Sequence, residues 1–467
     1  MALAHDLSSR ELQETAGRRC AFIREALIRD GLHDATSERA DGDPAALTTR
    51  WRIAPSCFLI SPSELAFFRT LGSHLLAFYR ALNRLYHDSV HGSQPAWVSE
   101  CLDQGKPESL VAYSRMKRFR DLLPGIIRPD IIPVENGMIM TELDSVPGGI
   151  GLLGSLSKIY HEMEGETRKT EVIGGPHGMV SGFAAMIRHR IDDRSGCLAI
   201  VVSEEAKDYR PEMIWLAARL RAEGLESYCV GPREIRFTEE ALMISGDRGD
   251  GDRLVSALYR FFELFDLKNV PKSELIMYSA KKDQVVVTPP FKPALEEKSA
   301  FALFHHPILR PFWQRELGDD TWQALNAIIP RTWVLDPRPL PPAAVIPNLQ
   351  IGDRAIADWR DLAEASQKDR RYVIKPSGFS ELAWGSRGVS VGHDLPQPKW
   401  AERLESALNA FPATPHVLQE FHKGRQFNLS YYDPQTDAVV PMAGRARLPP
   451  YYFVTGNRAE LAGILAT

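Results

Sequence analysis

Four charged residues with the spacing of a β-hairpin are the first candidates for chemistry. An Asn-Gly pair ending at Gly137 lies between two apolar runs and predicts a hairpin. A three-residue loop ending there would place Asp130 opposite Glu142 and Arg128 opposite Asp144, all on one face, whereas a two-residue loop would move Asp130 to the other face. Three carboxylates beside one guanidinium supply oxygen ligands for Mg²⁺ and a fork for phosphate. The alternative is a solvent-exposed hairpin with incidental charges.

A second candidate is a lysine at the end of an apolar strand. Lys375 is followed by a loop with Gly378, Gly385 and Gly388. Such a loop lets backbone N–H groups approach phosphates while the ammonium group supplies charge. The segment is neither a Walker loop nor a dinucleotide fingerprint, and a solvated β-turn is the alternative.

The third candidate segment follows an apolar strand that ends in Gln419-Glu420. The backbone groups at the edge of this strand could bind adenine, and the Glu420 carboxylate could bind the ribose hydroxyls. Further on, Arg445 and Arg447 are two residues apart, so on a strand they would share a face and could clamp phosphate. In isolation, an edge strand capped by polar residues explains the same pattern.

Hydrophobic periodicity indicates which elements position these residues. Residues 10–120 read as mostly helical: Ser61 to Glu64 have the pattern of a capping box, and apolar residues then recur at spacings of three and four as far as Leu85. From about residue 125 the period changes, and two strands around a helix form a βαβ pattern, which predicts a parallel sheet. The expected elements are strands at 197–203 and 228–230, a helix ending near 220, a helix through 258–265, a strand at 275–278, a Pro-rich linker at 336–347, a strand at 372–375, a helix at 398–410, a strand at 417–420 and a hairpin turning at 433–434.

Together, the three segments resemble the ATP-grasp superfamily, in which two α+β lobes hold ATP between them. The resemblance rests on a strand-Lys-Pro-x-Gly loop followed, about 45 residues later, by Gln-Glu-Phe-x-x-Gly. Because the Glu-x-Asp pair of the hairpin lies before this segment, the order resembles that of the circularly permuted ATP-grasp group, in particular the synthetase domain of glutathionylspermidine synthase.

The resemblance implies roles for individual residues. Arg128 would stabilise the transferring phosphoryl group, and Asp130, Glu142 and Asp144 would ligate Mg²⁺, with Asp144 standing where the family has Asn. Lys375 matches the second nucleotide-binding lysine of the family. Lys298 is the nearest match to the first, although the His305-His306 segment is an alternative alignment. Gly378, Gly385, Gly388, Gln419, Glu420 and Arg445 complete the expected nucleotide site.

Composition limits the possible classes of protein. The chain has 467 residues, 44% hydrophobic and 25% charged, which excludes collagen-like, disordered and coiled-coil proteins. A net charge of −4 gives no general attraction to nucleic acid or anionic membranes. Five scattered cysteines without a C-x-x-C pair predict buried, inert thiols. Without a signal-peptide pattern or an apolar run of about 18 residues, we expect a soluble cytoplasmic protein.

The expected fold is α/β (α+β), with a helical region at 1–120, a parallel-sheet domain carrying the hairpin at 121–285 and a two-lobed ATP-grasp-like domain at 286–467. The expected function is an ATP-dependent carboxylate–amine ligase that forms an amide through an acylphosphate. Its cofactors would be ATP and Mg²⁺, and its substrates a small-molecule carboxylate, such as an amino acid or peptide, and an amine. Two alternatives remain: a metal-dependent nuclease of the Pro-Asp…Glu-x-Lys type, whose third member would here be Asp144, and a non-catalytic nucleotide-binding protein. Oligomeric state stays open.

Overall fold

The computed structural model of the chain describes residues 9–33, 52–164, 171–245, 251–341, 343–433 and 435–467. Its N-terminal region is helical, as expected, with α1 (Ser9–Arg29), α2 (Pro62–Val90), α3 (Ala96–Asp103) and α4 (Glu108–Ser114). The predicted capping box begins α2: Ser61 N–H donates to Glu64 Oε2 at 2.7 Å, and Glu64 N–H donates to Ser61 Oγ at 3.2 Å. The apolar stripe behind it is buried in the core.

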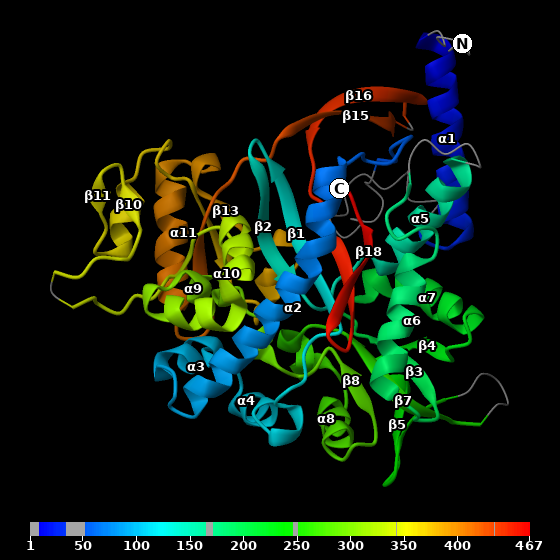
Figure 1. Cartoon of the computed structure of the whole chain (residues 1–467), viewed down its shortest axis with the longest axis horizontal. Helices are drawn as coiled ribbons and strands as arrows, with labels where there is room; N and C mark the ends of the chain where they lie inside the picture. The colour runs from blue at the N-terminus through cyan, green and yellow to red at the C-terminus, as the bar shows by residue number, and fades with distance from the viewer. Residues whose placement is uncertain (1–8, 34–51, 165–170, 246–250, 342, 434) are drawn as a thin grey trace.

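The central sheet carries the predicted hairpin and draws strands from both ends of the chain (Figure 1). Its strands, in the order β18-β17-β1-β2, are β1 (Ile126–Val134), β2 (Gly137–Asp144), β17 (Pro450–Thr455) and β18 (Arg458–Ile464). Alternate side chains enter two cores: Ile127 and Tyr452 pack with α2, whereas Ile126 and Phe453 pack against α5 (Ile150–Glu164) and α6 (Gly178–Ile191). The sheet is therefore covered on both faces.

A second, mixed sheet contains the predicted parallel pair. Its strands are β3 (Cys197–Val202), β4 (Ser227–Val230), β5 (Ile235–Phe237), β6 (Leu242–Ile244), β7 (Arg253–Phe261) and β8 (Val286–Thr288), with α7 (Arg210–Ala222) between β3 and β4. Strand β3 pairs in parallel with both β4 and β7, and β7 pairs in parallel with β8. The carboxyl ends of β3 and β7 thus lie at one edge of the sheet.

Two predicted elements in this sheet are wrong. The first part of the helix predicted through 258–265 is instead the end of strand β7, which is buried on both faces so that its apolar residues do not alternate, and a short 3-10 helix, Leu264–Asn269, follows. The strand at 275–278 is instead α8 (Ser273–Lys281), which buries Ile276 and Ala280 at helical spacing while Tyr278 is 52% exposed. Short apolar runs do not distinguish buried strands from helices.

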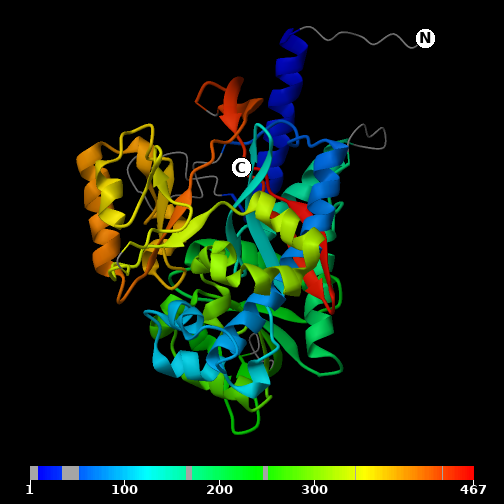
Figure 2. The same cartoon turned by 60° about the vertical axis from the view of Figure 1, so that its left-hand side comes forward.

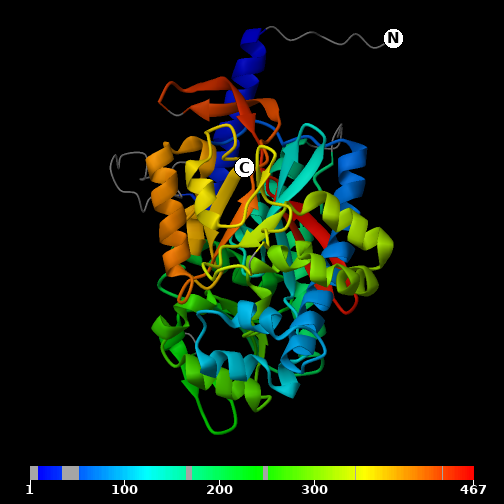
Figure 3. The ribbon, with the colours of Figure 1, turned by 90° about the vertical axis from the view of Figure 1, so that its left-hand side faces the viewer.

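A third sheet with its own core forms a separate lobe, seen beside the central sheet in Figures 2 and 3. Its strands, in the order β13-β12-β14-β9, are β9 (Thr332–Val334), β12 (Tyr372–Pro376), β13 (Ser390–Val391) and β14 (His416–Glu420), and α11 (Gln397–Ala410) covers it. The small pair β10 (Gln350–Ile351) and β11 (Arg354–Ala355) follows the predicted linker, and α9 (Ser299–His305) and α10 (Arg310–Ile328) precede β9. We call residues 332–420 the β12 lobe.

The predicted hairpin near residue 433 is confirmed as β15 (Gln426–Asp433) and β16 (Ala438–Arg445), although Pro434 lies outside the described residues. This hairpin extends toward α1 (Figure 1). The mixed α/β class is confirmed. The domain boundaries at 120 and 285 stay a prediction, and the central sheet joins strands from both sides of residue 285.

The five cysteines are free; Cys20 and Cys197 are buried, as expected, and the other three are partly exposed. In the described part of the chain, no helix has both the length and the apolar composition needed to span a bilayer.

Candidate functional site

The register of the β1–β2 hairpin brings the four predicted residues to one face. Arg128 pairs with Asp144 and Asp130 pairs with Glu142, as the sequence predicts. The three-residue loop is wrong, because Val134 pairs with Gly137 and the loop has two residues. A bulge after Asp130, where Thr141 has no partner in the ladder, restores the predicted pairing.

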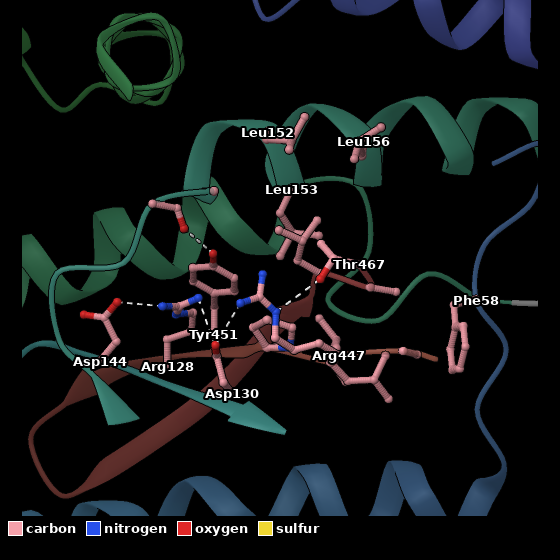
Figure 4. Close-up of a pocket in the computed structure, with 18 of the residues that line it drawn as sticks. Phe58, Arg128, Asp130, Asp144, Leu152, Leu153, Leu156, Arg447, Tyr451 and Thr467 are labelled. Atoms are coloured by element: carbon pink, nitrogen blue, oxygen red, sulfur yellow. Dashed lines mark hydrogen bonds and ion pairs between the residues drawn. The ribbon is translucent and has the colours of Figure 1, made fainter. Parts of the chain in front are cut away.

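Arg128 joins two of the three carboxylates (Figure 4). Its guanidinium lies 3.0 Å from Asp130 Oδ1 and 2.6 Å from Asp144 Oδ2. Arg447 NH1 donates to the second oxygen of Asp130 at 3.0 Å. Burial of Arg128 opposes its charge, but the two carboxylates outweigh this effect and raise its pKa. Each of these two guanidinium groups is thus paired with a carboxylate of the hairpin.

Two lysines from different elements reach the same hairpin. Lys298, at the start of α9, lies 2.8 Å from Glu142 Oε1. Lys375 of β12 donates at 2.8 Å to the backbone oxygen of Thr141 and at 2.8 Å to Gln419 Oε1. Burial alone would raise the pKa of Glu142, but the charges of Lys298 and Lys375 lower it to about 2. Lys375 therefore connects the β12 lobe directly to β2.

The carboxylates have the right chemistry for a hard cation but do not converge on one point. Within the described residues, no three His, Cys, Asp or Glu side chains are arranged to hold a metal ion. Asp130 Oδ1 is nevertheless buried and accepts no hydrogen bond of good geometry, although Arg128 lies near it. Lys298 already pairs with Glu142 Oε1 and Arg128 with Asp144 Oδ2, so an ion that used these two oxygens would have to displace both cations.

The glycine-rich segment 377–388 crosses from the β12 lobe toward the mixed sheet. A Cβ at Gly378 would lie 2.0 Å from the backbone oxygen of Glu296, so only glycine allows this approach. Two ion pairs join the segment to residues that follow β3 and β7 of the mixed sheet: Arg387–Glu205 at 3.1 Å and Lys268–Glu381 at 2.8 Å. Both pairs are exposed and each contributes little stability.

We expect segment 377–388 to exchange amide hydrogens rapidly without nucleotide and more slowly with it, because few apolar contacts anchor it. Hydrogen-exchange mass spectrometry with and without ATP and Mg²⁺ measures this, with α11 as an internal reference. Slow exchange in the free protein that nucleotide leaves unchanged would contradict a closing role.

The remaining predicted nucleotide residues are distributed unevenly around the site. Gln419 is buried beside Lys375. The N–H groups of Glu420 and Phe421 already donate to the carbonyls of Arg331 and Arg371, at 2.8 and 2.9 Å. Gly378 and Gly385 line the large cavity described below, whereas Gly388, Glu420 and Arg445 are not among its lining residues. Arg445 Nε instead donates to the carbonyl of Gly424 at 2.9 Å.

Of the two alternatives for the first lysine, only Lys298 lies at the hairpin. Lys298 contacts the hairpin, whereas His305 Nε2 lies 2.9 Å from the carbonyl of Ile329 and His306 packs against Trp97. Burial lowers the pKa of both histidines. The position next to Glu142 therefore belongs to Lys298.

A cavity of about 1920 Å³ lies beside the hairpin, lined by Arg128, Asp130, Glu142 and Asp144 among others. One side of it carries carboxylates that the sequence analysis missed, and we call these the acidic wall: Glu205, Asp208, Glu212, Glu263 and Glu296. Burial, together with Asp144 and Glu296, holds the pKa of Glu263 well above its usual range. Burial also raises the pKa of Glu212 to about 7, although it accepts the N–H of Leu152 at 3.1 Å. The signal that could have found three of them is their position, since Glu205, Asp208 and Glu263 follow the carboxyl ends of β3 and β7.

Comparison with known proteins places the fold. No family model matches the sequence, and no curated protein matches it either. Among solved structures, a glutathione synthetase-like effector from Globodera pallida, determined in the apo form, is similar with a TM-score of 0.58 at 10% identity, over 99% of this chain and 95% of that one. A protein described as a proposed gamma-glutamylcysteine synthetase from Methylobacillus flagellatus matches with a TM-score of 0.39 and 11% identity, over 89% of this chain and 84% of that one. At such identities the first likeness shows the fold alone, and the second is too weak to support an argument.

Proposed function

We propose that the protein is an ATP-dependent carboxylate–amine ligase of the ATP-grasp type. The observation that carries the proposal is the meeting of Lys298, Lys375 and the carboxylate hairpin, which come from three separate segments of the chain. The similarity in fold to a glutathione synthetase-like effector supports it. The circularly permuted order inferred from the sequence belongs to the same proposal.

The proposed reaction has two steps. An oxygen of the substrate carboxylate attacks the γ-phosphorus of ATP, so that a C–O–P linkage forms and ADP leaves. The amine nitrogen then attacks the acyl carbon, loses a proton and displaces inorganic phosphate. Arg128 stabilises the charge that develops on the transferring phosphoryl group, and Lys298 and Lys375 bind the nucleotide phosphates.

Asp130, Glu142 and Asp144 would hold Mg²⁺, which neutralises phosphate charge when bound. Asp130 Oδ1 supports this assignment, because it is buried and accepts no hydrogen bond of good geometry.

The proposal is tested by phosphate release. We expect pooled amino acids, small peptides and amines to stimulate release of phosphate from ATP and Mg²⁺ only when a carboxylate and an amine are both present. Mass spectrometry would identify the amide product. Duplex-DNA cleavage without nucleotide dependence would favour the nuclease instead, and ATP binding without turnover over the whole pool would favour a non-catalytic protein.

A proton should be taken up when nucleotide binds near pH 8. Burial lowers the pKa of Lys375 to about 8, so a large share of the lysine is neutral at that pH. A polyanion favours the charged form, so binding draws a proton from the buffer, and affinity falls as the pH rises above 8. Titration calorimetry in buffers with different ionisation enthalpies measures the uptake.

Lys375→Arg, which stays charged, is the control for this uptake. If the wild-type protein takes up no more protons than Lys375→Arg, the lysine is already charged before nucleotide binds and the expectation is wrong.

A further inference from the structure

The large cavity continues from the hairpin into an apolar groove. We define the groove by Phe58, Leu59, Leu156 of α5, Phe427, Leu429 and Met442. Figure 4 shows leucines of α5 above this space, Phe58 at one side and Arg447 beneath. Leu59 is 69% exposed and Met442 38% exposed, so the described residues leave much apolar surface uncovered beside the proposed reaction site.

Contacts between side chains and backbone groups join the walls of the groove to one another. The rings of Phe58 and Phe427 meet edge to face at 4.8 Å, and the N–H of Tyr432 donates to the carbonyl of Ile53 at 2.9 Å. The Arg52 guanidinium also lies 4.1 Å from the centre of the Tyr431 ring. The segment before α2 is therefore fixed to β15, and the groove is a formed surface.

We propose that the carboxylate substrate carries a large apolar group that lies in this groove, with its carboxylate toward Arg447 and Arg128. This inference rests on the proposed ligase function and names the substrate class for it.

Charge sets the orientation of the substrate. The groove ends at Arg447, whose side chain is 48% exposed and whose guanidinium contacts both Asp130 and Thr467. Four carboxylates of the acidic wall lie on α7 or beyond the ends of β3 and β7, and Glu296 precedes α9, so none of the five is on an element that forms the groove. An anionic end thus meets guanidinium groups when it enters from the groove.

The volume of the large cavity is sufficient for two ligands. A pocket for one drug-sized ligand measures about 300–1,000 Å³, whereas this cavity measures about 1920 Å³. It has room for a substrate with a long apolar part in addition to a second reactant.

The test uses direct binding without ATP, so its outcome does not depend on catalysis. Calorimetric titration compares decanoate with acetate, decanamide and decylamine. We expect decanoate to bind at least about 100-fold more tightly than acetate, because each buried methylene contributes favourably, and more tightly than decanamide and decylamine, because Arg447 faces the head group. Equal affinity for decanoate and acetate overturns the groove assignment, and equal or better binding of decylamine overturns the orientation.

Two exposed apolar positions give a matched pair of variants. Leu59→Asp puts a charge in the groove, and Ile308→Asp puts the same charge at a 65% exposed position that is not among the cavity-lining residues. We expect Leu59→Asp to weaken decanoate binding at least tenfold and Ile308→Asp to change it less than twofold. The same effect in both variants contradicts the proposal. Decanoate binding without amide formation from ATP, decanoate and amines would support the groove while removing the proposed function.

Discussion

Replacing Arg128 with alanine should lower kcat about 10²- to 10³-fold while leaving the affinity for a non-hydrolysable ATP analogue nearly unchanged. The reason is that a group which acts on the phosphoryl group mainly in the transition state accelerates the chemistry without contributing to ground-state binding. Arg128 is paired with Asp130 and Asp144. Steady-state kinetics with the substrate pair and calorimetry with the analogue measure the two quantities separately.

Two variants control this experiment. Arg128→Lys keeps the charge but loses the two-pronged geometry, so it should recover only part of the rate. Arg194→Ala removes an arginine that pairs with Asp283 and is not among the cavity-lining residues, so it should leave kcat unchanged. An Arg128→Ala protein that is folded and has lost analogue binding would show that Arg128 is a ground-state ligand.

Replacing Lys375 with alanine should instead weaken binding of the ATP analogue, by at least about tenfold. The charge of Lys375 would meet the nucleotide phosphates already in the ground state, and a charge-assisted hydrogen bond contributes about 1.5–3 kcal/mol. The variant also frees Gln419 and the carbonyl of Thr141, which Lys375 joins across the two lobes. Calorimetry gives the affinity and thermal unfolding gives the stability.

Lys292 provides the matched control because it is another buried lysine with a lowered pKa, about 7 through burial. Its ammonium group donates to the carbonyls of Arg120 and Leu122, and it is not a lining residue of the cavities beside the hairpin. Lys292→Ala should therefore lower the melting temperature without changing nucleotide affinity. Unchanged affinity in Lys375→Ala would remove this lysine from the nucleotide site.

The β12 lobe lies close to β2, and this closeness affects how a nucleotide would enter the proposed site. The space among Lys375, Lys298, Glu142 and Gln419 measures only about 20 Å³, roughly the room for one water molecule. A nucleotide that contacts both lysines therefore requires Lys375, or the β12 lobe that carries it, to move away from β2. Part of the free energy of binding is then used to break the Lys375–Thr141 contact.

Local patterns predicted much of the fold because they depend on neighbours in the sequence. The capping box at Ser61, the helix that follows it, the strands β3, β12 and β14 and the β15–β16 hairpin all follow from periodicity and turn residues. Strand β7 and helix α8 were not predicted correctly, because tertiary burial decides between strand and helix in short apolar segments. Leu258 and Phe261 have helical spacing, yet both are buried in a strand at the centre of a sheet.

The site was predictable where its residues lie on one hairpin, and much less so elsewhere. The pairing of Asp130 with Glu142 was inferred correctly from an incorrect loop, because the bulge at Thr141 compensates for the shorter turn. Glu212 and Glu296 gave no signal in the sequence, since only the packing of separate elements brings them to the cavity. The sequence predicted that Arg445 and Arg447 share one face of a strand. Strand β16 instead ends at Arg445, and Arg447 donates a hydrogen bond to Asp130.

The pairing of β1 with β17 joins Ile126 to Phe453, more than 300 residues later in the chain. On a ribosome that adds about 5–20 residues per second, roughly 15 to 60 seconds pass between the emergence of β2 and that of β18. Throughout this time the inner edge of β1 has no neighbouring strand, and such an edge is a template for aggregation. The nascent chain therefore needs shielding for most of its synthesis. A messenger truncated before the codons for β17 would yield an aggregation-prone polypeptide with an open sheet edge.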